Sequence, residues 1–163
     1  MAAHPDLPKL LVDQLDDLQP LGRHLILVFR EFELEVLEAL HREGYDDLTE
    51  SDLEILRFIG PAGSRAVDVA RLAGMTKQGA GKAITSLEAR GYLMRRDDAR
   101  DSRASLVVFT RKGEALIGRA IEEIRRVERR YARLVGPKRL HEMKQALQRL
   151  LADHQARKAD GTA

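Results

Sequence analysis

The sequence predicts a mainly α (α+β) fold with several helices and one small β-hairpin, for three reasons. Apolar residues recur at steps of three and four along most of the chain, which is the periodicity of amphipathic helices. Two such segments are separated by a short turn containing Gly74, as in a helix-turn-helix. Residues 92–112 then hold two short apolar runs around an arginine-rich tip. Together these features predict a winged helix-turn-helix domain with a two-stranded β wing, flanked by helices on both sides.

Composition excludes several classes of protein. With 163 residues, of which 44% are hydrophobic, the chain can form one domain with a substantial core. No apolar run approaches the ~18 residues of a membrane span, and no basic-then-apolar pattern at the N-terminus indicates a signal peptide. The absence of cysteine excludes disulfides, thiol redox sensing and a cysteine-based zinc site. We therefore expect a cytoplasmic protein without a membrane partner.

Charge is distributed unevenly along the chain. Residues 1–64 contain 5 basic and 14 acidic residues, residues 65–112 contain 11 and 5, and residues 113–163 contain 12 and 7. A basic middle segment is typical of a nucleic-acid-binding module. Random clustering on a solvated surface is the alternative, and charge alone does not decide between them.

Two helices are predicted before the helix-turn-helix. The first should run from about Gln19 to Arg42, with Gly44 just after its end. The second should run from about Glu50 to Ile59, with Thr49 or Ser51 as N-cap and an acidic capping-box partner three residues later. Their expected inward residues are Leu18, Leu21, Leu25, Val28, Phe29, Phe32, Val36 and Leu40 in the first helix, and Leu53, Leu56 and Phe58 in the second.

The helix-turn-helix itself is predicted between Ala66 and Arg90. A short helix, Ala66 to Ala73, is followed by Gly74 in left-handed geometry. Thr76 is then the N-cap of a recognition helix from Lys77 to Arg90, which Gly91 ends. The expected inward residues are Val69, Leu72 and Ala73 in the short helix, and Ala80, Ile84 and Leu87 in the recognition helix.

Two amphipathic helices follow the hairpin, one from about Lys112 to Leu134 with Thr110 as its cap, and one from Gly136-Pro137 to about Ala156. Because the winged domain is already complete, their apolar faces need a partner surface, either in a second copy or, alternatively, within the monomer. We divide the chain into an N-terminal arm with a first dimerisation helix (1–48), a winged helix-turn-helix region (49–110), C-terminal dimerisation helices (111–157) and a disordered tail (158–163).

Candidate DNA-binding residues lie at the start of the recognition helix, because the first turns of such a helix meet base edges and phosphates. Gln78 suits adenine in the major groove, Lys77 and Lys82 suit guanine or phosphate, and Thr76 suits phosphate. An ordinary solvated face is the alternative reading for the two lysines.

Two glycines in this helix are also candidates. Gly79 and Gly81 each destabilise a helix by about 1 kcal/mol relative to alanine. Their presence indicates that something approaches the backbone closely. DNA is one possibility, and close helix packing is the other.

The tip of the predicted wing carries Arg100, Asp101 and Arg103. Arg103 is the candidate for insertion into a narrow A·T-rich minor groove, whose negative potential attracts guanidinium groups. Asp101 has the wrong charge for a phosphate contact, so we expect it to pair with Arg100 or Arg103 and fix the tip. For both arginines, a surface ion pair contributing ~0–1 kcal/mol is the alternative.

These stretches resemble the MarR family of winged-helix transcriptional regulators. The resemblance is carried by residues 75–78 (MTKQ), 87–93 (LEARGYL), 95–103 (RRDDARDSR) and 106–113 (LVVFTRKG). The family's D-x-R-D-x-R wing motif is met by Asp98, Arg100, Asp101 and Arg103. Its L-T-x-x-G junction departs only in having Phe109 in place of leucine.

The resemblance, which covers roughly residues 20–150, implies an obligate homodimer that binds double-stranded DNA at a pseudo-palindrome and usually represses transcription. It also implies release by a small aromatic or phenolic effector, bound between the dimerisation and DNA-binding regions. His24 on the first helix could line such a pocket, although a lone histidine is more often a surface or packing residue.

The sequence indicates no other chemistry. The histidines are scattered without metal-ligand spacing, and no nucleophile–base pair, phosphate-binding glycine loop or carboxylate dyad is recognisable. We therefore expect no metal, no cofactor and no enzymatic activity. A winged-helix protein-interaction module without DNA binding is the alternative function, and the retention of Lys77, Gln78, Lys82 and Arg103 argues against it.

Overall fold

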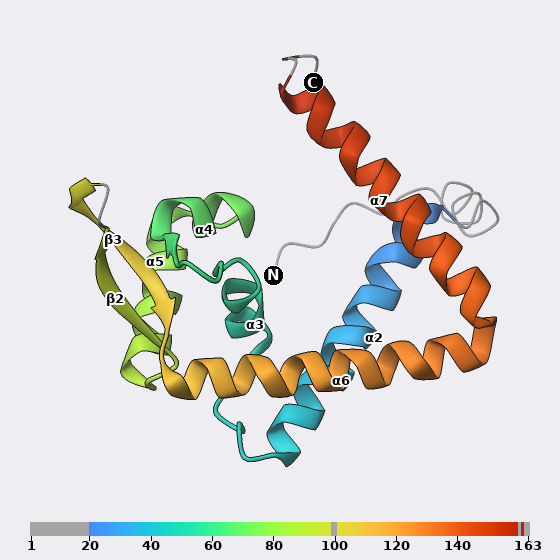
Figure 1. The fold of residues 1–163 in the computed structure, drawn as a ribbon, viewed down its shortest axis with the longest axis horizontal. Coiled ribbons are helices and arrows are strands. Elements are labelled where there is room, and N and C mark those ends of the chain that lie inside the picture. The colour runs from blue at the N-terminus through green and yellow to red at the C-terminus, as the bar shows by residue number, and fades with distance from the viewer. Residues whose placement is uncertain (1–19, 99–100, 160, 162–163) are drawn as a thin grey trace, which may run out of the picture. The chain divides into compact units, whose positions relative to one another are not determined.

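The computed structural model describes residues 20–98, 101–159 and 161. Figure 1 shows mostly helices and one small sheet, with labels that begin at α2. The elements are α2 (Leu21–Arg42), α3 (Glu50–Leu56), β1 (Ser64–Arg65), α4 (Ala66–Leu72), α5 (Lys77–Ala89), β2 (Leu93–Asp98), β3 (Asp101–Phe109), α6 (Arg111–Val135) and α7 (Pro137–Ala159). The predicted mainly α (α+β) winged helix-turn-helix fold is thereby confirmed.

The chain divides into two compact units, with the boundary between Leu116 and Ile117. The first unit holds α2 to β3 and the start of α6, and the second holds the rest of α6 with α7. None of the described helices is long and apolar enough to cross a membrane.

Helix α2 buries only the second half of its apolar stripe. Val36 and Leu40, both predicted to point inward, are buried. The first half is exposed instead, at Leu21, Leu25, Val28 and Phe29 among others, and Leu18 lies outside the described residues. Because large apolar side chains in water are unfavourable, this half of α2 presents a surface suited to a partner.

The core of the first unit forms where α5 packs against α3 and α4. The predicted inward residues Ala80, Ile84 and Leu87 of α5 are fully buried, with Val69 of α4. Glycines end the helices as predicted. Gly74 has φ +64°, and the next amide, Met75 N–H, donates to the Ala70 carbonyl at 2.9 Å. This bond satisfies a carbonyl that the helix end leaves free.

Four further positions predicted to point inward are not buried, namely Leu72, Ala73, Leu53 and Phe58. Leu72 is 49% exposed, whereas Ala70 is buried. The reason is that the buried face of α4 is centred between Val69 and Ala70, and at 3.6 residues per turn Leu72 lies about 110° around the helix from that centre. In the second predicted helix, Ile55 and Ile59 are buried, while Leu53 is only half-buried. Phe58 is also half-buried, because α3 ends at Leu56, before this residue.

The predicted hairpin is confirmed as β2 and β3, but the sheet contains a third strand that was not predicted. β1 pairs antiparallel with β3, with Ser64 opposite Val107, and gives the strand order β1-β3-β2. Gly63, at φ +93°, lies so close to β3 that a Cβ there would be 2.6 Å from Cγ1 of Val108. Ser64 fixes the turn, since its Oγ donates to the Phe58 carbonyl at 3.0 Å and accepts from Gly60 N–H at 2.9 Å.

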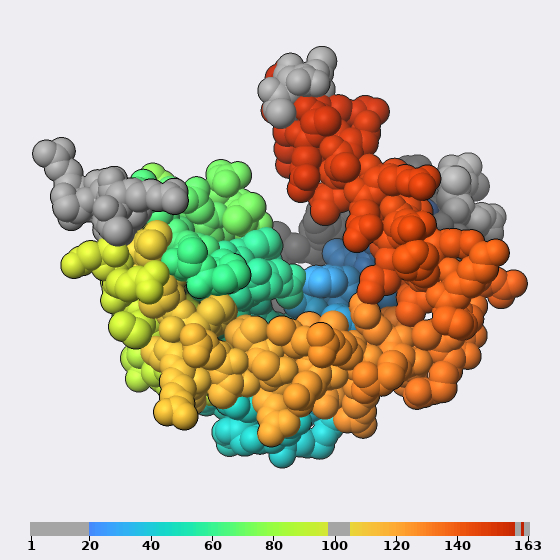
Figure 2. Space-filling model, viewed as in Figure 1, coloured from blue at the N-terminus to red at the C-terminus, as the bar shows by residue number. Residues whose placement is uncertain are grey.

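The second unit is built from two long helices. An ion pair between Lys144 and Glu128, at 2.8 Å, joins α7 to α6. Figure 2 shows α6, coloured yellow to orange, with a long side open to solvent. Several large apolar side chains of this unit are exposed, namely Ile121, Leu134, Val135, Met143, Leu150 and Leu151.

Candidate nucleic-acid interface

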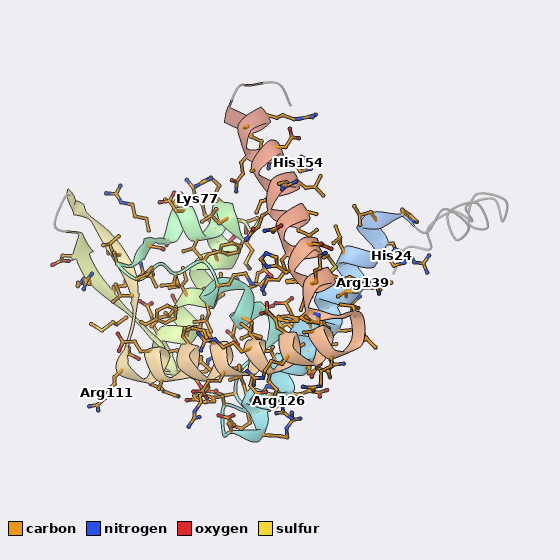
Figure 3. The ribbon with its side chains drawn as sticks, turned by 45° about the vertical axis from the view of Figure 1, so that its right-hand side comes forward. His24, Lys77, Arg111, Arg126, Arg139 and His154 are labelled. Carbon is orange, nitrogen blue, oxygen red and sulfur yellow. The ribbon has the colours of Figure 1, made fainter. Side chains whose placement is uncertain are left out.

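The start of α5 is built as an exposed helix N-terminus. Thr76 is its N-cap, as predicted, and the Thr76 Oγ1 accepts a hydrogen bond from Gly79 N–H at 3.0 Å. Lys77, Gln78 and Lys82 are all exposed. Figure 3 labels Lys77 at this end of the helix. Two cations, an amide and free N–H groups at a helix N-terminus form a surface suited to phosphates and base edges.

The two glycines of α5 have different surroundings. A Cβ on Gly79 would lie 3.1 Å from the Thr76 Oγ1 and would crowd the N-cap. A Cβ on Gly81 would meet no described atom within 4 Å. Close helix packing therefore does not account for Gly81 within the described part of the chain.

The other end of α5 is held by a buried ion pair that the sequence did not predict. The Arg90 guanidinium donates to both oxygens of Asp52, at 2.5 and 3.1 Å, and to the Asp47 carbonyl at 2.5 Å. Asp52 is 5% exposed and also completes the capping box of α3 with Thr49. The pair therefore fixes the C-terminal end of α5 to the N-terminal end of α3.

The charges of this pair stabilise each other. Burial raises the pKa of Asp52, but hydrogen bonds from Arg90 and Thr49 outweigh this effect, so the net pKa lies below the ordinary value of 3.8. The hydrogen bond to Asp52 likewise raises the pKa of Arg90. Next to them, burial and a 2.6 Å hydrogen bond to Asp47 raise the pKa of Tyr92.

The turn after α5 is also tied to the start of α6. Thr110 Oγ1 donates to the Gly91 carbonyl at 2.5 Å and, as predicted for a cap, accepts from Gly113 N–H at 3.1 Å. Lys112 Nζ donates to the Arg90 carbonyl at 2.9 Å and lies 4.0 Å from the centre of the Tyr92 ring. A Cβ at Gly113 would overlap the Tyr92 carbonyl oxygen. Helix α5, strand β2 and helix α6 therefore meet in one closely packed junction.

The base of the wing is braced from both sides. On β2, Arg95 pairs with Glu88 of α5 at 3.1 Å. Arg96 donates to the Ala62 carbonyl in the turn before β1 at 3.1 Å. The first contact ties the wing to the recognition helix, and the second ties it to the turn before β1.

The predicted residues of the wing tip are described only in part. Arg100 lies outside the described residues. Asp101 and Arg103 lie in β3, where Asp101 is opposite Asp98 across the hairpin, but only their backbone is described. The pairing of Asp101 with an arginine, and the minor-groove role of Arg103, remain predictions.

His24, the candidate effector residue, lies on the exposed first part of α2. Its Nδ1 is 3.3 Å from the carbonyl oxygen of Pro20, one turn earlier, and Figure 3 shows it near the start of that helix. Its role in binding an effector also remains a prediction.

The buried pair of Asp52 and Arg90 could not be found from sequence alone. Asp52 was visible as a capping-box residue and Arg90 as a residue at the end of a helix. The two are separated by 38 positions, and no local pattern links them.

Comparison with known proteins agrees with this geometry. A model of the MarR family matches residues 46–104, which run from just before α3 into the first part of β3. A transcriptional regulator from Thermotoga maritima is 27% identical with a TM-score of 0.59, and the match covers 86% of this chain and 98% of that one. A search of curated proteins found no significant match.

Two further structures are similar. A MarR family protein from Mycobacterium tuberculosis, in complex with salicylic acid, is 28% identical with a TM-score of 0.61, covering 80% of this chain and 96% of that one. A mutant MarR from E. coli, complexed with operator DNA, is 18% identical with a TM-score of 0.66, covering 84% and 97%, and this likeness concerns the fold alone. Its helix-turn-helix, its wing and the family model that matches residues 46–104 make this chain similar to the MarR family of winged-helix transcriptional regulators.

Proposed function

We propose that this chain is a sequence-specific regulator that binds double-stranded DNA as a homodimer in the cytoplasm, and that it represses transcription until a small-molecule effector releases it. The observation that carries this proposal is the exposed N-terminus of α5, where Lys77, Gln78 and Lys82 lie free of the core. The buried Asp52–Arg90 pair holds the other end of the same helix. A recognition surface of this kind needs a rigid support, because base readout depends on precise placement.

In this function the two parts of the domain read different features of DNA. The start of α5 enters the major groove, where Gln78 bonds adenine and Lys77 or Lys82 contacts guanine or phosphate. Thr76 contacts phosphate beside the helix N-terminus. The wing reaches the adjacent minor groove with Arg103, and Arg100 and Asp101 fix its tip.

The exposed apolar faces support the homodimer. The first half of α2 exposes Leu21, Leu25 and Phe29, and the second unit exposes Leu134 and Leu151. Burying such faces against a second copy removes them from water. The proposed division is then a dimerisation segment in 1–48, a DNA-binding region in 49–110 and dimerisation helices in 111–157. A two-fold dimer presents two recognition helices ~34 Å apart and reads a pseudo-palindrome.

The effector is proposed to be a small aromatic or phenolic compound. The complex of the Mycobacterium tuberculosis relative with salicylic acid supports this class. His24 is the candidate contact in this chain, because it combines a polar ring with a neighbouring apolar stripe on α2.

The proposal is tested by titrating the purified protein into the DNA upstream of its own coding sequence and into a scrambled duplex of the same length, over a series of salt concentrations. Tight binding to the first, a wide gap over the scramble and a steeply negative salt slope are expected. Sedimentation should give twice the monomer mass of 18.4 kDa. Failure to bind either duplex at low salt would favour the protein-interaction module instead.

Gln78→Ala is expected to reduce discrimination at one base pair in each half-site by ~1–3 kcal/mol, because a bidentate contact to adenine is lost. The measurement is the affinity of the variant for duplexes carrying each substitution at that position. Equal weakening on all sequences would place Gln78 on a phosphate and contradict its assignment to base readout.

Arg103→Ala is expected to weaken binding and to lower the preference for sites with a narrow A·T-rich minor groove, because the guanidinium that such a groove attracts is removed. Competition between A·T-rich and G·C-rich flanks measures this preference. The matched control is Arg42→Ala, which removes a surface arginine paired with Glu38 and should leave the preference unchanged. Unchanged affinity of the Arg103 variant for A·T-rich sites would refute the role of the wing.

A further inference from the structure

The outer face of α6 carries a row of arginines. Arg125, Arg129 and Arg133 are spaced four residues apart, so they lie on one side of the helix and rise ~6 Å per step. All three are exposed. Val127, which is 1% exposed, lies two residues from Arg125 and from Arg129 and therefore on the opposite side of the helix. The row faces away from the buried side of α6.

The row has no counter-charge within the described part of the chain, unlike five other cations of the second unit. Among the described residues, none of these three arginines has an ion-pair or hydrogen-bond partner. Other cations of the unit are paired, at 2.8 to 3.8 Å: Arg119 with Glu122, Arg126 with Glu123, Lys138 with Glu142, Lys144 with Glu128 and Arg157 with Asp153.

A row of like charges at this spacing destabilises a helix, whereas a glutamate at one of the three positions would stabilise it. Stability of α6 therefore does not explain the row. Basic residues without a described partner do occur elsewhere in this unit, at Arg139, Arg149 and Lys158, but their spacings of ten and nine residues place them on different sides of α7. Only the three arginines of α6 form a continuous row among the described residues.

We propose that this arginine row is a second DNA-binding surface, which contacts the phosphate backbone of double-stranded DNA without reading its sequence. Residues 117–135 contain six arginines and no lysine, and arginine presents a planar fork that suits phosphate oxygens. Glu122 and Arg126 are charged neighbours on this face, and the exposed Ile121 lies one turn before Arg125, but no large apolar side chain is exposed on this face between Arg125 and Arg133. An interface with an acidic protein would need an apolar centre, whereas contacts with the DNA backbone are polar throughout.

The surface lies wholly in the second unit, so it is separate from the recognition helix and goes beyond the function proposed above. Contacts to phosphates add affinity and salt dependence but no sequence information. The row would increase the affinity for DNA of any sequence, while the helix-turn-helix determines the specificity for the operator.

The test compares two triple variants with the same change of charge. Arg125→Gln/Arg129→Gln/Arg133→Gln removes the row, and Arg119→Gln/Lys138→Gln/Arg157→Gln removes three paired cations of the same unit. Glutamine is a good helix former, and circular dichroism checks that both variants stay folded. The measured quantity is the affinity for a long scrambled duplex as a function of salt concentration.

The salt slope is the change in the logarithm of the binding constant with the logarithm of the salt concentration. We expect this slope to be less steep in the row variant by about 0.9 for each lost phosphate contact, or about 2.7 per protomer. Between about 50 and about 200 mM salt, its affinity should then fall about 40-fold less than that of the wild type. The control should keep most of the wild-type slope. A row variant with the wild-type slope would refute the proposal. The proposal would also be refuted if the row variant bound DNA as the wild type does but no longer bound poly-glutamate. That result would assign the row to binding an acidic protein.

A variant of the recognition helix separates this proposal from the function above. Lys77→Gln/Lys82→Gln should lose preference for the operator but keep the part of the salt slope that depends on the arginine row. If the protein has no preferred sequence at all, the proposed regulatory function fails. The contribution of the row to binding the scrambled duplex can still be measured in that case.

Discussion

Arg90→Met is expected to destabilise the protein by about 3 kcal/mol or more, because it leaves the buried Asp52 carboxylate without its partner. Methionine keeps the aliphatic packing of the arginine stem, so the loss reports on the contacts of the guanidinium with the Asp52 carboxylate and the Asp47 carbonyl. Chemical denaturation at neutral pH measures the free energy of unfolding. A loss below about 1 kcal/mol would show that water replaces Arg90 easily and that the pair does not hold α5.

The double variant Asp52→Asn/Arg90→Met is the matched control. It leaves no buried charge, so it should recover part of the stability lost in the single variant. In addition, at a temperature where Arg90→Met is fully folded, its ratio of operator to scrambled affinity should fall. The salt slope of DNA binding should stay unchanged, because Arg90 positions the recognition helix and does not contact phosphate.

The pair also predicts a dependence of stability on pH. The pKa of Asp52 is lower in the folded state than its ordinary value of 3.8. Its contribution to stability is therefore present above pH 3.8 and is lost as pH falls through the folded pKa. In Arg90→Met the carboxylate lacks this stabilisation, so the variant should unfold at a higher pH than the wild type during acid titration.

Gly113→Ala is expected to have the other large effect, a loss of about 3 kcal/mol or more. The added Cβ would overlap the Tyr92 carbonyl oxygen and approach Cδ1 of Phe109 to 3.0 Å. Because one of these groups is backbone, the junction of α5, β2 and α6 must move to make room. Thermal unfolding of the variant measures the loss.

Gly118→Ala is the control for this variant. Gly118 lies in the same helix, α6, and a Cβ there meets nothing among the described atoms within 4 Å. Alanine is the better helix former, so this change should stabilise the protein by up to about 1 kcal/mol. If both variants behave alike, the close approach of Gly113 to Tyr92 is absent in solution.

Local signals in the sequence were sufficient for most of the fold. Gly74 and Gly91 end helices through left-handed geometry, and Thr49, Thr76 and Thr110 begin them through side-chain caps. Each signal acts within about four residues of the chain. The hairpin was equally local, since its two apolar runs alternate and flank one polar tip.

The features that sequence could not predict depend on contacts between distant residues. Strand β1 has two residues, too few for a pattern, and exists because Gly63 allows the chain to pass close to β3. Burial of Ala70 in place of Leu72 depends on which side of α4 meets α5. The Asp52–Arg90 pair joins two helix ends that only the tertiary fold brings together.

Selection from a random DNA library tests the central claim most directly. The purified protein should enrich an inverted repeat whose half-sites are centred ~34 Å apart, about one turn of DNA. Lys77→Gln/Gln78→Ala/Lys82→Gln should enrich no such repeat, while the Arg42→Ala control enriches the same repeat as the wild type. Enrichment of no sequence by the wild type, at a salt concentration where it binds DNA, would contradict the assignment of α5 as a recognition helix.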